Sequence, residues 1–207
     1  MGKITSLKTS GRKNRVNVFI DGTFSFTVDG ELAARAGLRV GRELSASEVE
    51  ELRQADLFQG CFRAALHYLG YRPRSEAEVK QRLHRRGFAA DVVDSVIAEL
   101  KKRNLIDDMA FAQYWRDNRL SFKPRSQRLI KLELWQKGVS AETSAQIVEG
   151  LDDETIAYEA GRRKARAMVG LDYDEFRHRL FGYLQRRGFG YEVVSSVVSR
   201  LWEEKGA

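Results

Sequence analysis

The sequence predicts a mainly α protein, in which tandem three-helix repeats form an elongated curved array behind a small N-terminal antiparallel β-meander. Two observations support this fold class. Two β-prone runs surround Asp21-Gly22, whereas apolar residues after position 56 recur at helical spacing. In that second part, three segments align without gaps on Gly87, Gly138 and Gly188, which lie 51 and 50 residues apart.

The first 56 residues are expected to form one domain. Residues 16–20 and 23–28 flank Asp21-Gly22, and an Asp-Gly pair between such runs favours a tight hairpin because both residues accept positive φ at low cost. We therefore predict a meander over residues 3–28. Two short helices should follow, at Gly30–Ala36 and Ser45–Ala55, the second with a capping box from Ser45 to Glu48 or with Ser47 as a competing cap.

Each repeat is expected to contain three helices. The middle helix ends at the aligned glycine, which suits the left-handed C′ position, and its aliphatic residues eight and four positions earlier lie on one face. These buried positions are Val79 and Leu83, Ile130 and Leu134, Leu180 and Leu184. The last helix begins near Asp91, Ala141 or Tyr191 and carries the triplets Val96/Ile97/Leu100, Ile147/Val148/Leu151 and Val197/Val198/Leu201.

A further helix precedes each of these pairs and completes the repeat. We place these helices at Leu57–Leu69, Met109–Leu120 and Ile156–Met168, so the three repeats span residues 57–106, 107–153 and 154–207. Pro73 blocks helix continuation, and Ser75 to Glu78 has the spacing of a capping box.

Composition narrows the functional classes. The chain has 207 residues, a net charge of +7 and one cysteine, with no apolar run near the roughly 20 residues that cross a bilayer. The N-terminus lacks the apolar core of a secretory signal, so a cytoplasmic, non-membrane protein is expected. Residues 61–137 carry 17 Lys/Arg against 9 Asp/Glu, whereas residues 138–207 carry 10 against 12. The positive excess in the middle of the chain favours a polyanion or an acidic partner.

A search for catalytic chemistry is negative. The sequence has no Walker loop and no Gly-x-Gly-x-x-Gly after a strand, so we predict neither enzyme activity nor a cofactor. His67, His84 and His178 stand alone, and Cys61 lies in an apolar run typical of a core, so no metal site is expected. Asp107-Asp108 and Asp152-Asp153-Glu154 could be imagined as Mg²⁺ ligands, but each precedes a helix, where carboxylates serve as caps.

The succession of motifs from residue 57 to about 204 resembles the RecX family. Its first part is Arg72-Pro73-Arg74-Ser75-Glu76-Ala77-Glu78-Val79, continuing through Arg85-Arg86-Gly87-Phe88 to Val92-Val93. Its second part is Leu105-Ile106-Asp107-Asp108-Met109-Ala110-Phe111-Ala112, with Trp115, Arg119, Lys123-Pro124-Arg125-Ser126 and the Leu134–Gly138 motif.

The resemblance implies a cytoplasmic regulator that binds RecA filaments on single-stranded DNA and inhibits ATP hydrolysis and strand exchange during homologous recombination. It also implies a curved helical shape that lies in the filament groove. Two departures stand out: the N-terminal meander is absent from many members, and the third repeat is acidic at 152–154 and 172–175. We therefore expect the third repeat not to share the polyanion contacts of the first two.

Basic residues of the two middle helices are the predicted contact site for RecA or DNA. Trp135 is the preferred aromatic, ahead of Tyr71, Tyr114 and Phe122, because its counterparts in the other repeats are polar. The predicted residues are Lys80, Arg82, Arg85, Arg86, Lys123, Arg125, Arg128, Lys131, Trp135 and Lys137. The alternative for each cation is a solvated helix face or compensation of the helix dipole. At the level of function, the alternative is a DNA-binding module that acts without RecA; a monomer is the simplest expectation.

Overall fold

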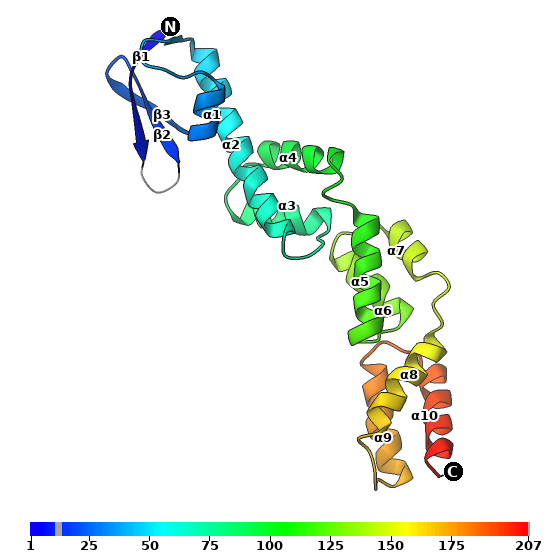
Figure 1. Cartoon of the computed structure of the whole chain (residues 1–207). Helices are drawn as coiled ribbons and strands as arrows, with labels where there is room; N and C mark the ends of the chain where they lie inside the picture. Colours follow the sequence, from blue (N-terminus) through cyan, green and yellow to red (C-terminus); the bar gives the residue numbers. More distant parts are fainter. Residues whose placement is uncertain (11–13, 207) are drawn as a thin grey trace. The chain divides into compact units, whose positions relative to one another are not determined.

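The computed structural model describes residues 1–10 and 14–206 and separates into two compact units. The first unit contains Met1–Tyr71 and Lys80–Arg103, and the second joins Arg72–Val79 to the chain from Asn104 onward. In the described part of the chain, three strands are followed by helix α1, a short fourth strand and then nine further helices (Figure 1). None of these helices is both long enough and apolar enough to cross a membrane.

A four-stranded antiparallel sheet opens the first unit, with strand order β3-β2-β1-β4. Its strands are β1 (Gly2–Ser10), β2 (Arg15–Ile20), β3 (Thr23–Asp29) and β4 (Glu43–Leu44). The predicted hairpin is confirmed, since Asp21 and Gly22 both have positive φ, 50° and 80°, as a type I′ turn requires. The connection at residues 11–13 lies outside the described residues. Strand β4 was not predicted, because two residues are too few to show the alternation of a strand.

One sheet face packs on helices to form the first core. Ile4, Val18, Phe26 and Val28 are buried there together with Leu44. Helix α1 (Gly30–Arg35) begins at Asp29, whose side chain accepts from the Glu31 N–H. The burial on one sheet face follows from the alternation of apolar residues along β2 and β3.

Helix α2 (Ala46–Leu69) corrects the prediction of two separate helices at Ser45–Ala55 and Leu57–Leu69. Its start is as predicted, because Ser45 and Glu48 form both hydrogen bonds of a capping box. No new cap forms at Asp56, because this carboxylate accepts from Arg15 at 2.7 and 2.8 Å and from the Asp29 N–H at 2.8 Å. The helix therefore continues, and the boundary proposed at residue 56 falls inside it.

The remaining helices follow the predicted three-helix pattern. They are α3 (Glu76–Arg85), α4 (Ala90–Lys102), α5 (Asp108–Phe122), α6 (Gln127–Gln136), α7 (Ala141–Val148), α8 (Asp153–Ala165), α9 (Tyr173–Gln185) and α10 (Tyr191–Gly206). Gly87, Gly138 and Gly188 have φ of 87°, 78° and 87°, so all three take the predicted left-handed conformation. After α3, Gly87 donates to the His84 carbonyl and Phe88 to the Leu83 carbonyl, the paired bonds of a Schellman motif.

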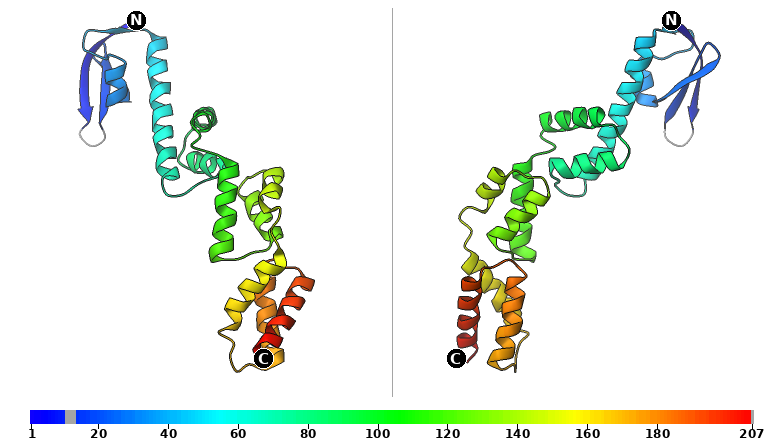
Figure 2. Two further views of the ribbon diagram at one scale, coloured as in Figure 1. Left: turned by 45° about the vertical axis from the view of Figure 1, so that its right-hand side comes forward. Right: turned by 180° about the vertical axis from the view of Figure 1, so that it is seen from behind.

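The repeats build separate hydrophobic cores from the predicted aliphatic positions. In the second repeat Ile130, Leu134 and Ile147 are buried with Phe111. In the third, α8, α9 and α10 lie side by side in every view (Figures 1 and 2) around a core that includes Leu180. One predicted helix position is wrong: Leu151 does not belong to the last helix of its repeat, because α7 ends at Val148 and Gly150 turns the chain with φ of 76°. Leu151 still packs against the second core and is half-buried.

Candidate functional site

The start of α3 lies against the end of α6, and this contact determines which basic side chains are free. Ser75 accepts from the Glu78 N–H at 3.2 Å, which caps α3, and its hydroxyl donates to the Lys137 carbonyl at 2.6 Å. A Cβ on Gly138 would lie 2.3 Å from the Ala77 Cβ. Gly138 is therefore needed for close approach of the two helices as well as for its positive φ.

The same contact recurs between α6 and the end of α9. Ser126 caps α6 by accepting from the Leu129 N–H, and its own N–H donates to the Arg187 carbonyl at 3.0 Å. The Arg187 guanidinium donates to the Pro124 carbonyl at 2.9 Å. A Cβ on Gly188 would lie 2.6 Å from the Ser126 hydroxyl, whereas nothing lies within 4 Å of one on Gly87. Residues 73–75 and 124–126, which we call the Pro-Arg-Ser segments, thus each contact the glycine turn of the following repeat.

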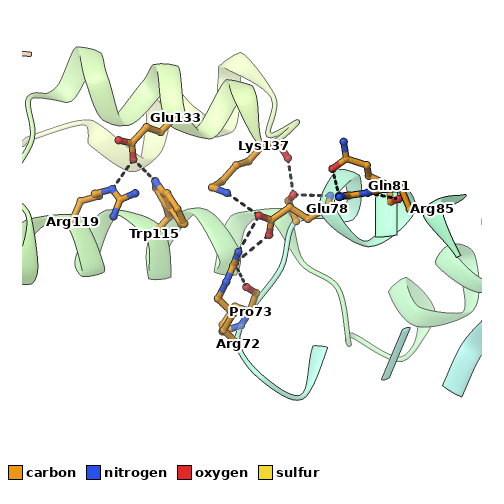
Figure 3. Close-up of polar contacts among 10 residues, drawn as sticks. Arg72, Pro73, Glu78, Gln81, Arg85, Trp115, Arg119, Glu133 and Lys137 are labelled. Carbon is orange, nitrogen blue, oxygen red and sulfur yellow. Dashed lines mark hydrogen bonds and ion pairs between the residues drawn. The ribbon is translucent and has the colours of Figure 1, made fainter. Parts of the chain in front are cut away.

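Glu78 is the centre of an ion-pair cluster at the first of these contacts (Figure 3). Its carboxylate accepts from Arg72 at 3.0 and 3.1 Å and from the Lys137 Nζ at 2.7 Å. Burial alone raises the pKa of Glu78, but the two cations outweigh it and hold the pKa below its usual value. The predicted capping box is therefore only half formed, because the Glu78 side chain binds cations in place of the Ser75 N–H.

Trp115 forms a platform beside this cluster. The Lys137 Nζ and the Arg119 guanidinium each lie 4.2 Å from the centre of its ring. Its indole N–H donates to Glu133 at 2.7 Å, and the Arg119 Nε donates to the same oxygen at 2.6 Å (Figure 3). Arg125 also pairs with Glu133, which therefore receives two cations.

Several predicted site residues consequently have partners within the chain. Lys137 and Arg125 are held by Glu78 and Glu133, as described above. Lys80 pairs with Asp94 at 3.0 Å, and the Arg82 guanidinium lies 5.7 Å from the Tyr68 ring centre. Arg85 is exposed and donates to the Gln81 carbonyl and side chain. For these five residues, a role in stabilising the fold accompanies any role in binding.

Three other predicted residues lie on one exposed face of α6. Arg128, Lys131, Leu132 and Trp135, which we call the α6 face, follow the i, i+3, i+4, i+7 spacing of a helix side. Trp135 is 67% exposed and Leu132 42% exposed. Within residues 1–10 and 14–206, Arg128 and Lys131 have no ion pair or hydrogen bond to another side chain, and the same holds for the exposed Lys123 and Arg86. The α6 face therefore combines free positive charge with an exposed indole.

The remaining candidates have structural roles. Cys61 is fully buried, and burial raises the pKa of its thiol to about 11, which confirms it as a core residue. Asp107 and Asp152 cap α5 and α8 as predicted. Hydrogen bonds from the Thr155 hydroxyl and from backbone N–H groups lower the pKa of Asp152. Among the described residues, no group of three or more His, Cys, Asp or Glu side chains is placed to hold a metal ion.

The acidic partners of the basic residues are not among the predicted site residues. The spacing predicts Glu78 only as part of a capping box and predicts no role for Glu133, although both lie among cations in or near the Pro-Arg-Ser segments and α6. The available signal was the repetition of Arg72-Pro73-Arg74-Ser75 as Lys123-Pro124-Arg125-Ser126. A repeated non-helical segment of that kind indicates a repeated contact.

Comparison with known proteins supports one family. Successive stretches match the RecX N-terminal domain over residues 2–45 and the first, second and third RecX three-helix domains over residues 61–100, 107–146 and 152–198. The regulatory protein RecX of Clostridium perfringens strain SM101 is 30% identical, with 97% of both chains covered. That of Lactobacillus johnsonii is 33% identical over 96% of this chain and 74% of its own length.

Solved structures agree on the fold. A crystal structure of regulatory protein RecX has a TM-score of 0.70 at 21% identity, covering 95% of this chain and 98% of the other. The crystal structure of RecX from Lactobacillus salivarius has a TM-score of 0.60 at 22% identity, covering 71% and 97%. With three-helix domains in tandem behind an N-terminal domain, and with relatives that match over nearly its whole length, the chain belongs to the RecX family of regulatory proteins.

Proposed function

We propose that this chain is a negative regulator of homologous recombination that binds RecA filaments on single-stranded DNA. Family membership supports RecA as the target. The α6 face is the single observation that carries the proposal to residues, because Arg128, Lys131 and Trp135 present charge and an indole that no described part of the chain covers. An interface rich in Arg and Trp is typical of contacts that dominate a binding energy.

Occlusion is the mechanism that this arrangement favours. Binding along the filament groove blocks filament extension or promotes disassembly, and it denies duplex DNA access to the bound strand. RecA's ATP hydrolysis and strand exchange then fall without any nucleotide site on this protein. Contacts from several repeats add up, since linked weak contacts raise the overall affinity. Arg86 and Lys123 are further candidates for such contacts, because both are exposed.

The alternative function is direct, sequence-independent DNA binding without RecA. Trp135 favours it as well, because an exposed aromatic beside cations suits the stacking of unpaired bases. This alternative requires tight binding to bare DNA with a steep salt dependence, close to 0.7 log units per phosphate neutralised on a single strand.

The deciding experiment is a titration of this protein into RecA that hydrolyses ATP on single-stranded DNA, with binding to the bare strand measured in parallel. A fall in hydrolysis at concentrations well below those that saturate bare DNA supports filament regulation. A fall only after bare DNA is saturated supports the alternative.

A pair of charge reversals tests the α6 face itself. We expect Arg128→Glu with Lys131→Glu to raise the concentration for half-inhibition by on the order of tenfold or more, because two attractive contacts become repulsive. The matched control is Lys3→Glu with Arg39→Glu, two exposed cations of the first compact unit, for which little change is expected. Equal inhibition by both double variants would remove the α6 face from the proposal while leaving the regulatory function intact.

A further inference from the structure

The third repeat has a hollow between α8 and α9 whose charged lining is entirely basic. Its volume is about 460 Å³. Lys164 lies on the α8 side, and the α9 side contributes His178, Arg179, Gly182, Tyr183 and Arg186. Lys164, Arg179 and Arg186 are exposed, so their charged groups are within reach of a ligand, and the His178 ring is exposed beside them.

No carboxylate is part of the lining of the hollow, although this repeat has a net negative charge, because most of its carboxylates have other positions. Asp152 and Asp172 cap the N-termini of α8 and α9, where they bind backbone N–H groups. Asp153 accepts from the Gln127 N–H, and Glu204 accepts from Tyr158 and Arg200. Glu175 pairs with Arg179 but is not part of the lining. A second hollow, on the other side of His178, includes Asp174 and suits an anion less well.

Gly182 leaves an open position in the lining of the hollow, because it has no side chain. It stands within α9, where glycine is unfavourable relative to alanine, and a Cβ there would lie 3.1 Å from the Arg186 Nη1. The missing side chain leaves room for the Arg186 guanidinium beside α9. Among the described residues, Arg186 has no ion pair or hydrogen bond through its side chain.

We propose that this hollow, here called the α8–α9 groove, binds the phosphates of a single-stranded nucleic acid. Arg and Lys are the side chains that neutralise phosphodiesters, and three of them line one concave surface. Among the described residues, Arg179 shares its charge with Glu175, whereas Lys164 and Arg186 have no carboxylate partner. The only aromatic ring in the lining, Tyr183, is half-buried and already has the Arg187 guanidinium 4.3 Å from its centre. The groove therefore binds the backbone, without base stacking and without sequence preference. This proposal goes beyond the function assigned to the α6 face, and it is an alternative to the expectation that the third repeat lacks polyanion contacts.

The test is binding of a fluorescent oligothymidylate to the full chain, measured by anisotropy over a range of salt concentrations. We expect Lys164→Gln with Arg179→Gln and Arg186→Gln to weaken binding on the order of tenfold or more at low salt. The slope of log affinity against log salt should shrink by about 2, since each phosphate neutralised on a single strand contributes roughly 0.7. The control, Lys3→Gln with Lys8→Gln and Arg39→Gln, removes the same charge from exposed positions of the first compact unit and should change neither quantity.

A second variant separates shape from charge. Gly182→Leu fills the hollow without changing its charge and places a better helix former in α9, so the fold should be kept while binding weakens severalfold. An abasic oligonucleotide of equal length should compete as well as the oligothymidylate for the groove contribution. The proposal is overturned if the groove variants bind like wild type, if the control triple loses as much, or if poly-glutamate binding falls equally, which would indicate an acidic protein surface. None of these outcomes bears on inhibition of RecA through the α6 face.

Discussion

At Glu78, one carboxylate is shared by two cations that come from either side of it. The side chains of Glu78, Lys137 and Arg72 are 15%, 21% and 27% exposed, so all three are largely removed from water. Charges in such a place are stable only while their partners are present, because each has given up part of its hydration. Lys137, which the sequence predicts as a binding residue, therefore also has a structural role.

Replacing Glu78 by glutamine should destabilise the protein. We expect a loss of about 2 kcal/mol, less than for a fully buried pair, because Arg72 and Lys137 keep some contact with water. Urea denaturation at pH 7 measures it, and Glu142→Gln, an exposed carboxylate in the first turn of α7, is the control with an expected change within about 0.5 kcal/mol. Similar values for the two variants would mean that the cluster contributes nothing to stability.

The same variant should also change the pH dependence of stability. The pKa of Glu78 in the folded state lies below its ordinary value of 4.5, so its contribution is present above that value and disappears as the pH falls through the folded pKa. The difference in unfolding free energy between wild type and Glu78→Gln should be constant from pH 7 to about 5 and shrink below it. A difference that persists at about pH 3 would show that the ionised carboxylate is not its source.

For single residues, the sequence predicted local roles such as helix capping better than it predicted which distant residues form ion pairs. Helix caps at Ser45, Asp107 and Asp152 were found because a cap bonds to N–H groups two or three residues away. The pairing of Glu78 with Lys137 spans 59 positions and depends on how two helices meet, so no local pattern could reveal it. The exposure of Trp135 could be predicted from the sequence, because the residues at the same position in the other two repeats are the polar His84 and Gln185.

Among the elements, the middle helix of each repeat is defined by how it begins and ends. Its glycine has positive φ in all three repeats. Of the three, only Gly138 and Gly188 also lie so near another helix start that an added Cβ would come within 3 Å of an atom there. The sequence identified the turn, since the αL conformation is a property of the backbone alone. It did not identify the docking, nor did it show that α2 continues past Asp56, because both depend on contacts between distant segments.

Alanine at these turns should separate the two effects. Gly87→Ala has open space, so it should cost roughly 1 kcal/mol for the positive φ alone. Gly138→Ala should cost about 1–3 kcal/mol more, because its Cβ overlaps Ala77 and α3 must shift. Equal losses of stability in urea denaturation would show that α3 moves aside without cost.

Over the whole molecule, hydrophobic burial is divided among separate cores. Phe176, Leu180 and Leu184 belong to the third repeat, Ile130 and Leu134 to the second, and the N-terminal sheet has its own set. A protein with divided cores opens in parts, because removing contacts in one cluster leaves the others packed.

Leu180→Ala should show this division by amide hydrogen exchange. A fully buried leucine replaced by alanine costs about 2–5 kcal/mol, and we expect that loss to appear as faster exchange in α8, α9 and α10. Strands β1 to β3 serve as the internal control and should keep their protection. If exchange accelerates uniformly along the chain, the molecule unfolds as one cooperative body.

The contact between a Pro-Arg-Ser segment and the next glycine turn has a direction. The first and second repeats each have a serine-capped middle helix, and the start of that helix contacts the glycine turn of the repeat that follows in the chain. The two sides of the contact are therefore different: one is a helix start and the other is a glycine turn. In the third repeat the middle helix is capped by Asp172 instead. A copy of the middle repeat inserted after residue 153 would find a matching end on both sides, so the length of the array can change while every joint stays the same. Reversing one repeat would instead place a glycine turn against a glycine turn, and two like ends do not match. The number of repeats is therefore open to variation in this architecture, whereas their direction along the chain is fixed.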